Sequence, residues 1–311
     1  MKAVRYHEYG DPQVMRYEDA ELPHPAPGQV LIRVAATSFN PVDASIRAGY
    51  LRQQLPVRFP HTPGLDVAGT VVALGEGVTG LDIGDAVIGF LPMNENGAAA
   101  EFVVAPAAVL AAVPRTVALA AAAALPAVAL TAWQALFEHA RLQAGQRVLI
   151  NGAGGGVGGY AIQLAKGAGA TVIATASPRS ADAVRAGGAD QLVDYTATLL
   201  TDAITEPVDV VLNLVRASDQ DMARLVGLVA PGGVLVTTTS PAQDDPAHGV
   251  RAISMFVRSD ARDLAAIVAR VDAGDLRIDI SASYPLTDIA LVHKQSDAGA
   301  IRSKVLLLPT T

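Results

Sequence analysis

The stretch QRVLINGAGGGVGG at residues 146–159 decides the fold. Val148, Leu149 and Ile150 form a short apolar run, which is typical of a buried parallel strand. A glycine-rich turn follows, and YAIQLAKGAGA then places apolar residues at helical spacing. A strand, a glycine turn and a helix within about 25 residues predict the opening of a dinucleotide-binding βαβ unit. A merely flexible turn would not explain the strand and the helix on either side.

The glycines of this turn suit a phosphate group. A pyrophosphate is anionic and is bound by backbone N–H groups at a helix N-terminus, and a Cβ at the closest approach would hold it off. Two registers fit the G-x-G-x-x-G motif loosely, namely Ala153, Gly155, Gly158 and Gly154, Gly156, Gly159. The first is preferred, because the strand ends at Asn151 and the tight turn should start there. Gly155, Gly156, Val157 and Gly158 are therefore the expected cofactor contacts in the turn.

Composition sets the class of protein. A chain of 311 residues with 51% hydrophobic residues is long enough for two domains and a large core. The chain has no cysteine, which excludes disulfides, thiolate zinc sites, iron–sulfur clusters and a cysteine nucleophile. Together with the lack of an apolar signal segment in MKAVRYHEYGD, this predicts a cytoplasmic enzyme.

Membranes and nucleic acids are not expected partners. No stretch of 18 apolar residues lacks a charge or a proline, so no membrane span is predicted. The net charge is −7 and there is no basic run, which argues against nucleic acid. The expected partner is a small-molecule substrate.

The N-terminal part predicts a compact β domain. Residues 2–6, 30–37 and 67–74 are expected to be strands, and residues 43–50 a short helix. Short strands separated by glycine turns are typical of a barrel-like β domain.

From residue 146 strands and helices alternate, which predicts a parallel, doubly wound sheet. The expected strands are 147–151, 171–176, 191–194, 208–214, 233–239 and 252–257, and the expected helices are 157–168, 180–187, 219–229 and 260–273. The tail after residue 274 returns to β character and should pair with the N-terminal domain. The predicted domains are 1–121 with about 274–311, and about 122–273.

This order of elements resembles the medium-chain dehydrogenase/reductase superfamily, in its zinc-free quinone oxidoreductase (zeta-crystallin-like) branch. The most specific segments are NPVDASIRAG at 40–49, PGLDVAGTV at 63–71, the AGGGVG turn, and GADQLVDY at 188–195. The resemblance implies a GroES-like β-barrel catalytic domain and an α/β Rossmann domain with a doubly wound parallel sheet. It also implies a homodimer formed through the edge of that sheet, and the apolar segment 232–240 is compatible with an edge strand.

The chain departs from the zinc-dependent members of this superfamily. Those members carry a histidine and a glutamate after the third-region glycine, whereas Gly64 is followed here by Leu65 and Asp66. His61 is a lone loop histidine, and a catalytic zinc needs three protein ligands. No metal site is expected, so hydride transfer must rely on positioning and hydrogen bonds.

The cofactor is expected to be NADP(H). An NAD site places an acid at the end of the second strand, but TVIATA is followed by SPRS, and the first acid is Asp182 in the next helix. Ser177, Arg179 and Ser180 can instead serve a 2′-phosphate, although Arg179 could be a solvated residue at a helix start. The resemblance adds Tyr195 to this site. It also adds a basic residue near the C-terminus, for which Arg302 and Lys304 are candidates, although either could be a surface charge.

The reacting centre is less distinct in the sequence. The resemblance places Thr131 and Asn40 near the nicotinamide, although Thr131 could bond its own backbone and Asn40 could cap a turn. Tyr50 could donate to a substrate carbonyl or simply pack. Asp43 is expected to cap a helix or to form an ion pair rather than to act as an acid catalyst. Asn213 stands where an aspartate is common, and the positions expected to line the cofactor near strand ends are Leu214, Val215, Thr238, Phe256 and Val257.

These features predict an NADPH-dependent oxidoreductase that reduces quinones or activated C=C bonds of enones by metal-free hydride transfer, with Asn40 and Tyr50 as the catalytic candidates. Two alternatives stay open. One is a zinc-free carbonyl or enoyl-thioester reductase, and the other is a family member that binds the cofactor without catalysis. Fold cannot separate them.

Overall fold

The computed structural model describes residues 1–309. The chain divides into two compact units. Unit 1 consists of Met1–Leu130, Arg258–Gly274 and the segment from Ile278 onward, and unit 2 consists of Thr131–Val257 and Asp275–Arg277. The predicted boundaries lay near residues 121 and 273. Helix α7 (Ala261–Ala273) falls in unit 1, where the Asp272 carboxylate accepts the amide N–H groups of Arg115 and Thr116.

Unit 1 is built on a sheet of mainly antiparallel strands, in the order β14-β15-β3-β4-β5-β7 with β6 paired to β3. Its strands are β3 (Gln29–Ser38), β4 (Asp66–Leu74), β5 (Ala86–Phe90), β6 (Phe102–Pro106), β7 (Leu110–Ala112), β14 (Ile280–Pro285) and β15 (Lys304–Leu308). A separate hairpin joins β1 (Lys2–Arg5) to β2 (Arg16–Asp19). Because β15 pairs with the end of β3, the predicted return of the C-terminal tail is confirmed.

The helices of unit 1 include α1 (Pro41–Arg47), α7 and α8 (Ile289–Asp297), with 3-10 turns at Pro12–Val14, Ala107–Val109, Ala120–Ala124 and Leu286–Asp288. Helix α2 (Pro126–Trp133) continues into a π-helical turn at Gln134–His139. One core cluster lies between the barrel strands and contains Val30, Ile32, Val67 and Val71. A second cluster packs α8 against β15, through Ile289, Val292, Val305 and Leu307.

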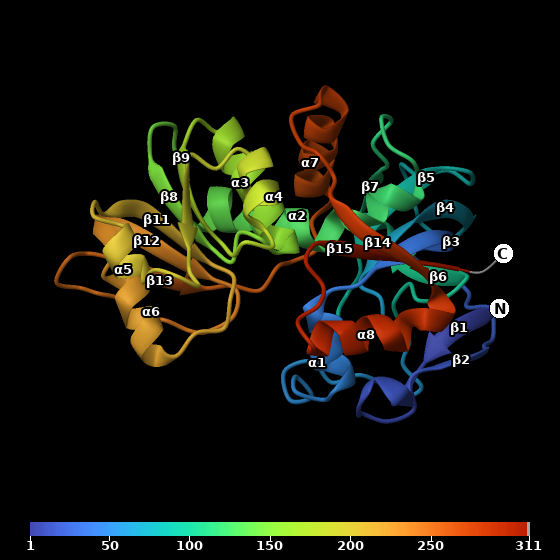
Figure 1. The fold of residues 1–311 in the computed structure, drawn as a ribbon. Coiled ribbons are helices and arrows are strands. Elements are labelled where there is room, and N and C mark those ends of the chain that lie inside the picture. Colours follow the sequence, from blue (N-terminus) through green and yellow to red (C-terminus); the bar gives the residue numbers. More distant parts are fainter. Residues whose placement is uncertain (310–311) are drawn as a thin grey trace. The chain divides into compact units, whose positions relative to one another are not determined.

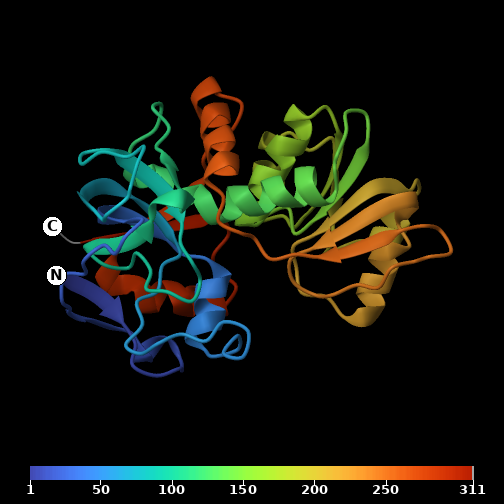
Figure 2. The same cartoon turned by 180° about the vertical axis from the view of Figure 1, so that it is seen from behind.

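Unit 2 is a parallel sheet in the order β10-β9-β8-β11-β12-β13. The strands are β8 (Arg147–Asn151), β9 (Thr171–Ala176), β10 (Gln191–Asp194), β11 (Val208–Asn213), β12 (Val229–Thr237) and β13 (Arg251–Ser254). Its helices include α3 (Gly156–Gly167), α4 (Ala181–Ala186), α5 (Leu200–Ala203) and α6 (Asp219–Val226). Figures 1 and 2 show α3 and α4 on one side of the sheet and α6 on the other. The strand order is that of a Rossmann fold, so the predicted fold class is confirmed.

One prediction about this sheet is wrong. Segment 232–240 was expected to contain an edge strand, but β12 lies between β11 and β13. The backbone of β12 is paired on this side by the four residues of β13. The edges of the sheet are β10 and β13.

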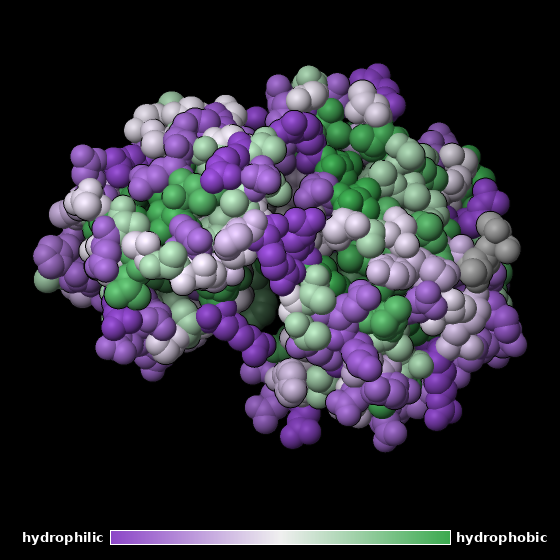
Figure 3. All heavy atoms as spheres, viewed as in Figure 1, coloured by the Kyte–Doolittle hydropathy of each residue, from purple (hydrophilic) through white to green (hydrophobic). Residues whose placement is uncertain are grey.

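The visible faces of both units carry mostly hydrophilic residues with smaller hydrophobic areas between them (Figure 3). Within residues 1–309, no helix has the length and apolar character needed to cross a membrane.

Candidate functional site

The residues predicted to bind the cofactor gather mainly at one edge of the unit 2 sheet. In a parallel sheet the carboxyl ends of all strands meet at the same edge. Asn213 at the end of β11 lies opposite Asn151 and Thr237, and Asp194 lies opposite Ala176. The predicted residues that follow these strand ends are Gly155, Gly156, Val157, Gly158, Ser177, Arg179, Ser180, Tyr195, Leu214, Val215, Thr238, Phe256 and Val257.

The glycine turn requires glycine at two positions for different reasons. Gly152 has a φ of +93°, and a Cβ there would lie 2.7 Å from Val215 Cγ1. A Cβ on Gly158 would lie 2.5 Å from the Ala153 backbone, whereas one on Gly159 would meet no atom within 4 Å. The close approach at Gly158 agrees with the preferred register. The left-handed residue of the turn, however, is Gly152, one residue before Ala153.

The N-terminus of α3 is suited to an anion. Gly155 is the N-cap, and its amide N–H donates to the Gly152 carbonyl oxygen at 3.2 Å. The first amide groups of any helix have no carbonyl one turn earlier to bond, and the helix dipole adds partial positive charge there. Gly156, Val157 and Gly158 form this first turn, and the glycines keep it open to a phosphate group.

The loop after β9 lies against the glycine turn. Ser180 Oγ accepts the Ser177 amide N–H at 3.2 Å, and a Cβ on Gly154 would lie 2.6 Å from that oxygen. Arg179 is exposed, and Tyr195 is 57% exposed. The Tyr195 amide N–H donates to the Ala176 carbonyl oxygen at 3.3 Å, which places Tyr195 beside this loop.

Two acids stand near the same loop. Asp182 on α4 is exposed and pairs with Arg185 at 3.0 Å. Asp194, which the sequence analysis did not consider, ends β10 beside Ala176. Its Oδ1 accepts the Thr196 hydroxyl at 2.6 Å and the Thr196 amide N–H at 2.9 Å, and these bonds lower the pKa of the carboxyl group. The strand pairing, and not the chain order, brings Asp194 to this place.

The remaining cofactor candidates differ in position. Thr131 is buried on α2 and belongs to unit 2, as does Phe256, which is 72% exposed. Arg302 is exposed and belongs to unit 1.

Lys304 does not fit the role of a phosphate ligand, and this alternative is wrong. Its side chain is 3% exposed, and its ammonium group donates to Phe39 O at 2.9 Å, Asn40 Oδ1 at 2.7 Å and Asp66 Oδ2 at 3.2 Å. All three donors are therefore used inside unit 1. The sequence could not show this, because the ion pair joins strands that are far apart in the chain.

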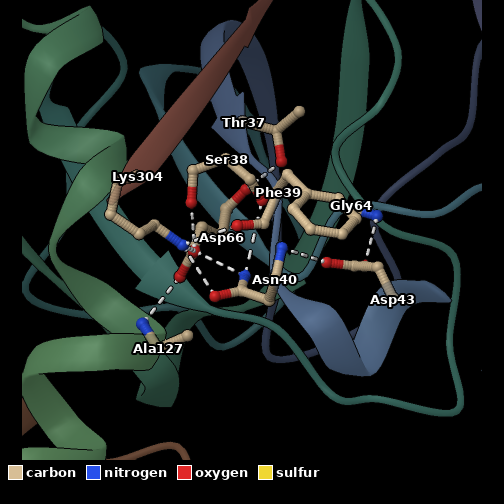
Figure 4. A network of polar contacts seen from close by, with 9 residues as sticks. All are labelled: Thr37, Ser38, Phe39, Asn40, Asp43, Gly64, Asp66, Ala127 and Lys304. Carbon is tan, nitrogen blue, oxygen red and sulfur yellow. Dashed lines mark hydrogen bonds and ion pairs between the residues drawn. The ribbon is translucent and has the colours of Figure 1, made fainter. Parts of the chain in front are cut away.

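Asn40 belongs to the same buried network (Figure 4). Its Nδ2 donates to Asp66 Oδ2 at 2.8 Å and to Ser38 O at 3.4 Å, while its Oδ1 accepts from Lys304. The Asp66 carboxylate also accepts hydrogen bonds from the Ser38 hydroxyl and from the Ala127 amide N–H, the latter at 2.7 Å. The hydrogen-bonding capacity of the Asn40 amide is used within unit 1.

Asp43 caps helix α1, as predicted. Its Oδ2 accepts the Asn40 amide N–H at 3.0 Å, and its Oδ1 accepts the Gly64 amide N–H at 3.1 Å. Burial raises the pKa of the Asp43 carboxyl to about 7. This carboxyl therefore ties α1 to the segment before β4 (Figure 4).

Tyr50 lies in the turn after α1 and is 76% exposed. It lines a pocket of about 400 Å³ together with Ala48, Gly49, Arg52, Gln53 and Gln54. Its phenol makes no hydrogen bond to any group within residues 1–309, so it is available to a ligand.

Within the described part of the chain, no cluster of three histidine, aspartate or glutamate side chains could hold a metal ion. His61 is buried against the Tyr6 ring, with 5.3 Å between the ring centroids. Burial lowers the pKa of His61 to about 4.

Two family models match the chain. The alcohol dehydrogenase GroES-like domain matches residues 26–115, and the zinc-binding dehydrogenase model matches residues 187–307. The quinone oxidoreductase of Lama guanicoe is 32% identical over 99% of this chain and 98% of its own length. A chloroplastic quinone-oxidoreductase homolog from Spinacia oleracea is 41% identical over 63% of this chain, and that match spans 61% of the spinach protein.

Solved structures have the same fold. The quinone oxidoreductase from Coxiella burnetii has a TM-score of 0.92 at 31% identity, covering 100% of this chain and 99% of that one. A mycobacterial protein complexed with NADPH has a TM-score of 0.87 at 28% identity, covering 99% and 100%. An NAD-dependent alcohol dehydrogenase has a TM-score of 0.90 at 28% identity, covering 100% of both chains.

Proposed function

We infer the function from the family, since the chain belongs to the medium-chain dehydrogenase/reductase family, in its quinone oxidoreductase branch. We propose that it is an NADPH-dependent oxidoreductase that reduces quinones or the activated C=C bonds of enones without a metal ion. The observation that carries the proposal is the glycine turn at the N-terminus of α3, bordered by the loop with Arg179 after β9.

Different residues would bind different parts of the nucleotide. Gly155, Gly156, Val157 and Gly158 would bind the pyrophosphate through backbone N–H groups. Ser177, Ser180, Arg179 and Tyr195 would bind the 2′-phosphate, with Arg302 as a further cation. The solved relatives include an NADPH complex and an NAD-dependent enzyme, so the choice of NADPH rests on Arg179.

The residues of this chain would then position the acceptor. When bound, the reduced nicotinamide supplies a hydride to an electron-poor quinone or enone. Negative charge develops on the carbonyl oxygen of the acceptor and requires a hydrogen-bond donor. The exposed Tyr50 phenol is the donor that we propose, while Asn40 acts as a positioning residue because its amide is held by Lys304 and Asp66. Thr131, Leu214, Val215, Thr238, Phe256 and Val257 are proposed to line the nicotinamide half.

The proposed assembly is a homodimer joined at an edge of the unit 2 sheet, as the resemblance implied. The edge that we propose is β13, since β12 is covered. The proposed compartment is the cytoplasm, for which the lack of cysteine is the supporting observation.

The function is tested by NADPH oxidation with a quinone, an alkyl enone and an aldehyde, beside titrations of NADPH and NADH followed by nicotinamide fluorescence. Turnover with the quinone or the enone is expected. Turnover with the aldehyde alone would favour a carbonyl reductase, and tight NADPH binding without turnover would favour a binding protein. If NADH binds as tightly as NADPH, the proposed cofactor preference is wrong.

A further inference from the structure

Polar side chains at the ends of neighbouring strands in unit 2 are hydrogen-bonded in a row. Thr175 Oγ1 accepts the Gly152 amide N–H at 2.8 Å and donates to Asn151 Oδ1 at 3.3 Å. Asn151 Nδ2 then donates to Asn213 Oδ1 at 2.9 Å. These bonds connect β9, β8 and β11 in that order.

The row continues onto β12. Asn213 Nδ2 donates to Val215 O at 2.9 Å and to Thr237 Oγ1 at 3.2 Å. The Thr237 hydroxyl in turn donates to Ser240 O at 2.9 Å. We call this row of Thr175, Asn151, Asn213 and Thr237 the strand-end ladder.

Each amide in the strand-end ladder has a fixed orientation. Asn213 is fully buried, and it accepts on its oxygen side and donates on its nitrogen side. Turning the amide over would place Nδ2 against Asn151 Nδ2 and Oδ1 against Val215 O. Asn151 Nδ2 and Val215 O, whose bonds to Asn213 are part-buried, would then each lose a partner, which is unfavourable. The ladder therefore has one stable arrangement.

The glycine turn and the Leu214–Val215 loop are both attached to this ladder. At one end Thr175 holds the amide of Gly152, whose backbone is left-handed. From the middle, Asn213 holds the carbonyl of Val215, and the Leu214 amide N–H donates to Asn151 O at 2.9 Å. The turn and the loop already touch, since a Cβ on Gly152 would lie 2.7 Å from Val215 Cγ1.

We propose that the strand-end ladder is a positioning device for the nucleotide, in which Thr175, Asn151, Asn213 and Thr237 hold the glycine turn and the Leu214–Val215 loop in the arrangement that receives the cofactor. The inference rests on the proposed function. It assigns a positioning role to buried side chains that do not themselves contact the nucleotide.

The test uses Thr175→Val, which keeps the shape of the side chain and removes the hydroxyl. The Gly152 amide and Asn151 Oδ1 then lose their partner and the turn is held less firmly, so NADPH should bind about tenfold more weakly, which corresponds to about 1.4 kcal/mol. Thr175→Ser keeps the hydroxyl and should restore binding to within about threefold of the wild type, on the same scale.

The matched control is Thr37→Val in unit 1. Thr37 is also fully buried, and its hydroxyl donates to Asp66 O at 2.7 Å. This exchange removes the same kind of group and should lower stability without changing NADPH affinity. If Thr37→Val weakens NADPH binding as much as Thr175→Val does, the effect is one of general stability and the positioning role is wrong.

A second variant tests the ladder as a unit. Thr237 reaches the glycine turn through Asn213 and Asn151, so Thr237→Val should shift the Gly152 amide resonance in an NMR spectrum. It should also combine non-additively with Thr175→Val in NADPH binding, because members of one network are coupled. Thr237→Val replaces Thr175→Val if the latter does not fold. Additive effects with an unchanged Gly152 resonance would overturn the proposal.

The proposed function and the ladder fail in different ways. If the wild type binds neither NADPH nor NADH, the proposed function is wrong. The Gly152 amide resonance, compared between Thr175→Val and Thr175→Ser without nucleotide, still decides whether the ladder holds the turn.

Discussion

At the scale of single residues, the buried pair of Lys304 and Asp66 has the largest expected effect on stability. Replacing Lys304 with Met leaves the Asp66 charge buried without a cation, and this should lower the free energy of unfolding by about 3–5 kcal/mol. Chemical denaturation would measure it. The control is Lys2→Met, which removes an exposed pair with Asp19 and should cost about 1 kcal/mol or less. Equal losses in the two variants would contradict the expectation.

Arg179 determines cofactor choice in the proposed function. Arg179→Ala removes the cation from the loop after β9, so NADPH should bind about tenfold more weakly or worse, while NADH affinity stays the same. Fluorescence titration of both nucleotides measures the ratio. Arg216→Ala, at another exposed arginine of unit 2, is the control. An unchanged NADPH affinity in Arg179→Ala would remove the main support for NADPH.

At the scale of elements, the cap of α1 makes stability depend on pH. Burial raises the pKa of Asp43 to about 7 from the ordinary value of 3.8, so the folded state holds this proton more tightly than the unfolded state does. The tighter proton binding of folded Asp43 stabilises the protein fully below pH 3.8, and this stabilisation is lost as the pH rises to about 7. The free energy of unfolding should therefore fall across this window, by up to about 1.4 kcal/mol for each pH unit.

Asp43→Asn removes the titrating group and should flatten this part of the stability profile. Denaturation at a series of pH values from 4 to 8 would show it, with Asp182→Asn on the exposed face of α4 as the control. A slope that is the same in the wild type and in Asp43→Asn would mean that Asp43 does not titrate in this range.

Elements with a local signal were predictable from the sequence. The β8–turn–α3 segment is set by its own apolar run and glycines, and parallel pairing then places most of the other predicted cofactor positions, though not Thr131 or Arg302, at the same edge. Helix α1 was expected at 43–50 but begins at Pro41, since the fixed φ of proline suits the first helical position.

Contacts that depend on pairing between distant segments could not be predicted. Lys304 reaches Asn40 because β15 pairs with β3, and no local pattern indicates that pairing in detail. In the same way, Asp194 comes beside Ala176 through the pairing of β10 with β9. The strand-end ladder had a weak signal, namely asparagine or threonine near the end of successive strands, but only the strand register shows that these side chains meet.

At the scale of the whole molecule, the exposed edge of the unit 2 sheet leads to the prediction of a homodimer. On the side away from β12, the edge strand β13 pairs with no other strand within residues 1–309, and a second copy can add a strand there. Light scattering after size exclusion should then give twice the chain mass of 32.0 kDa.

Ile253→Glu on β13 would bring like charges together at a two-fold interface, and it should shift the mass toward 32.0 kDa. The control is Ile83→Glu, which makes the same substitution at an isoleucine of unit 1 that is 67% exposed. This variant should leave the dimer intact. A wild-type protein that elutes as a monomer at working concentration would rule out the assembly.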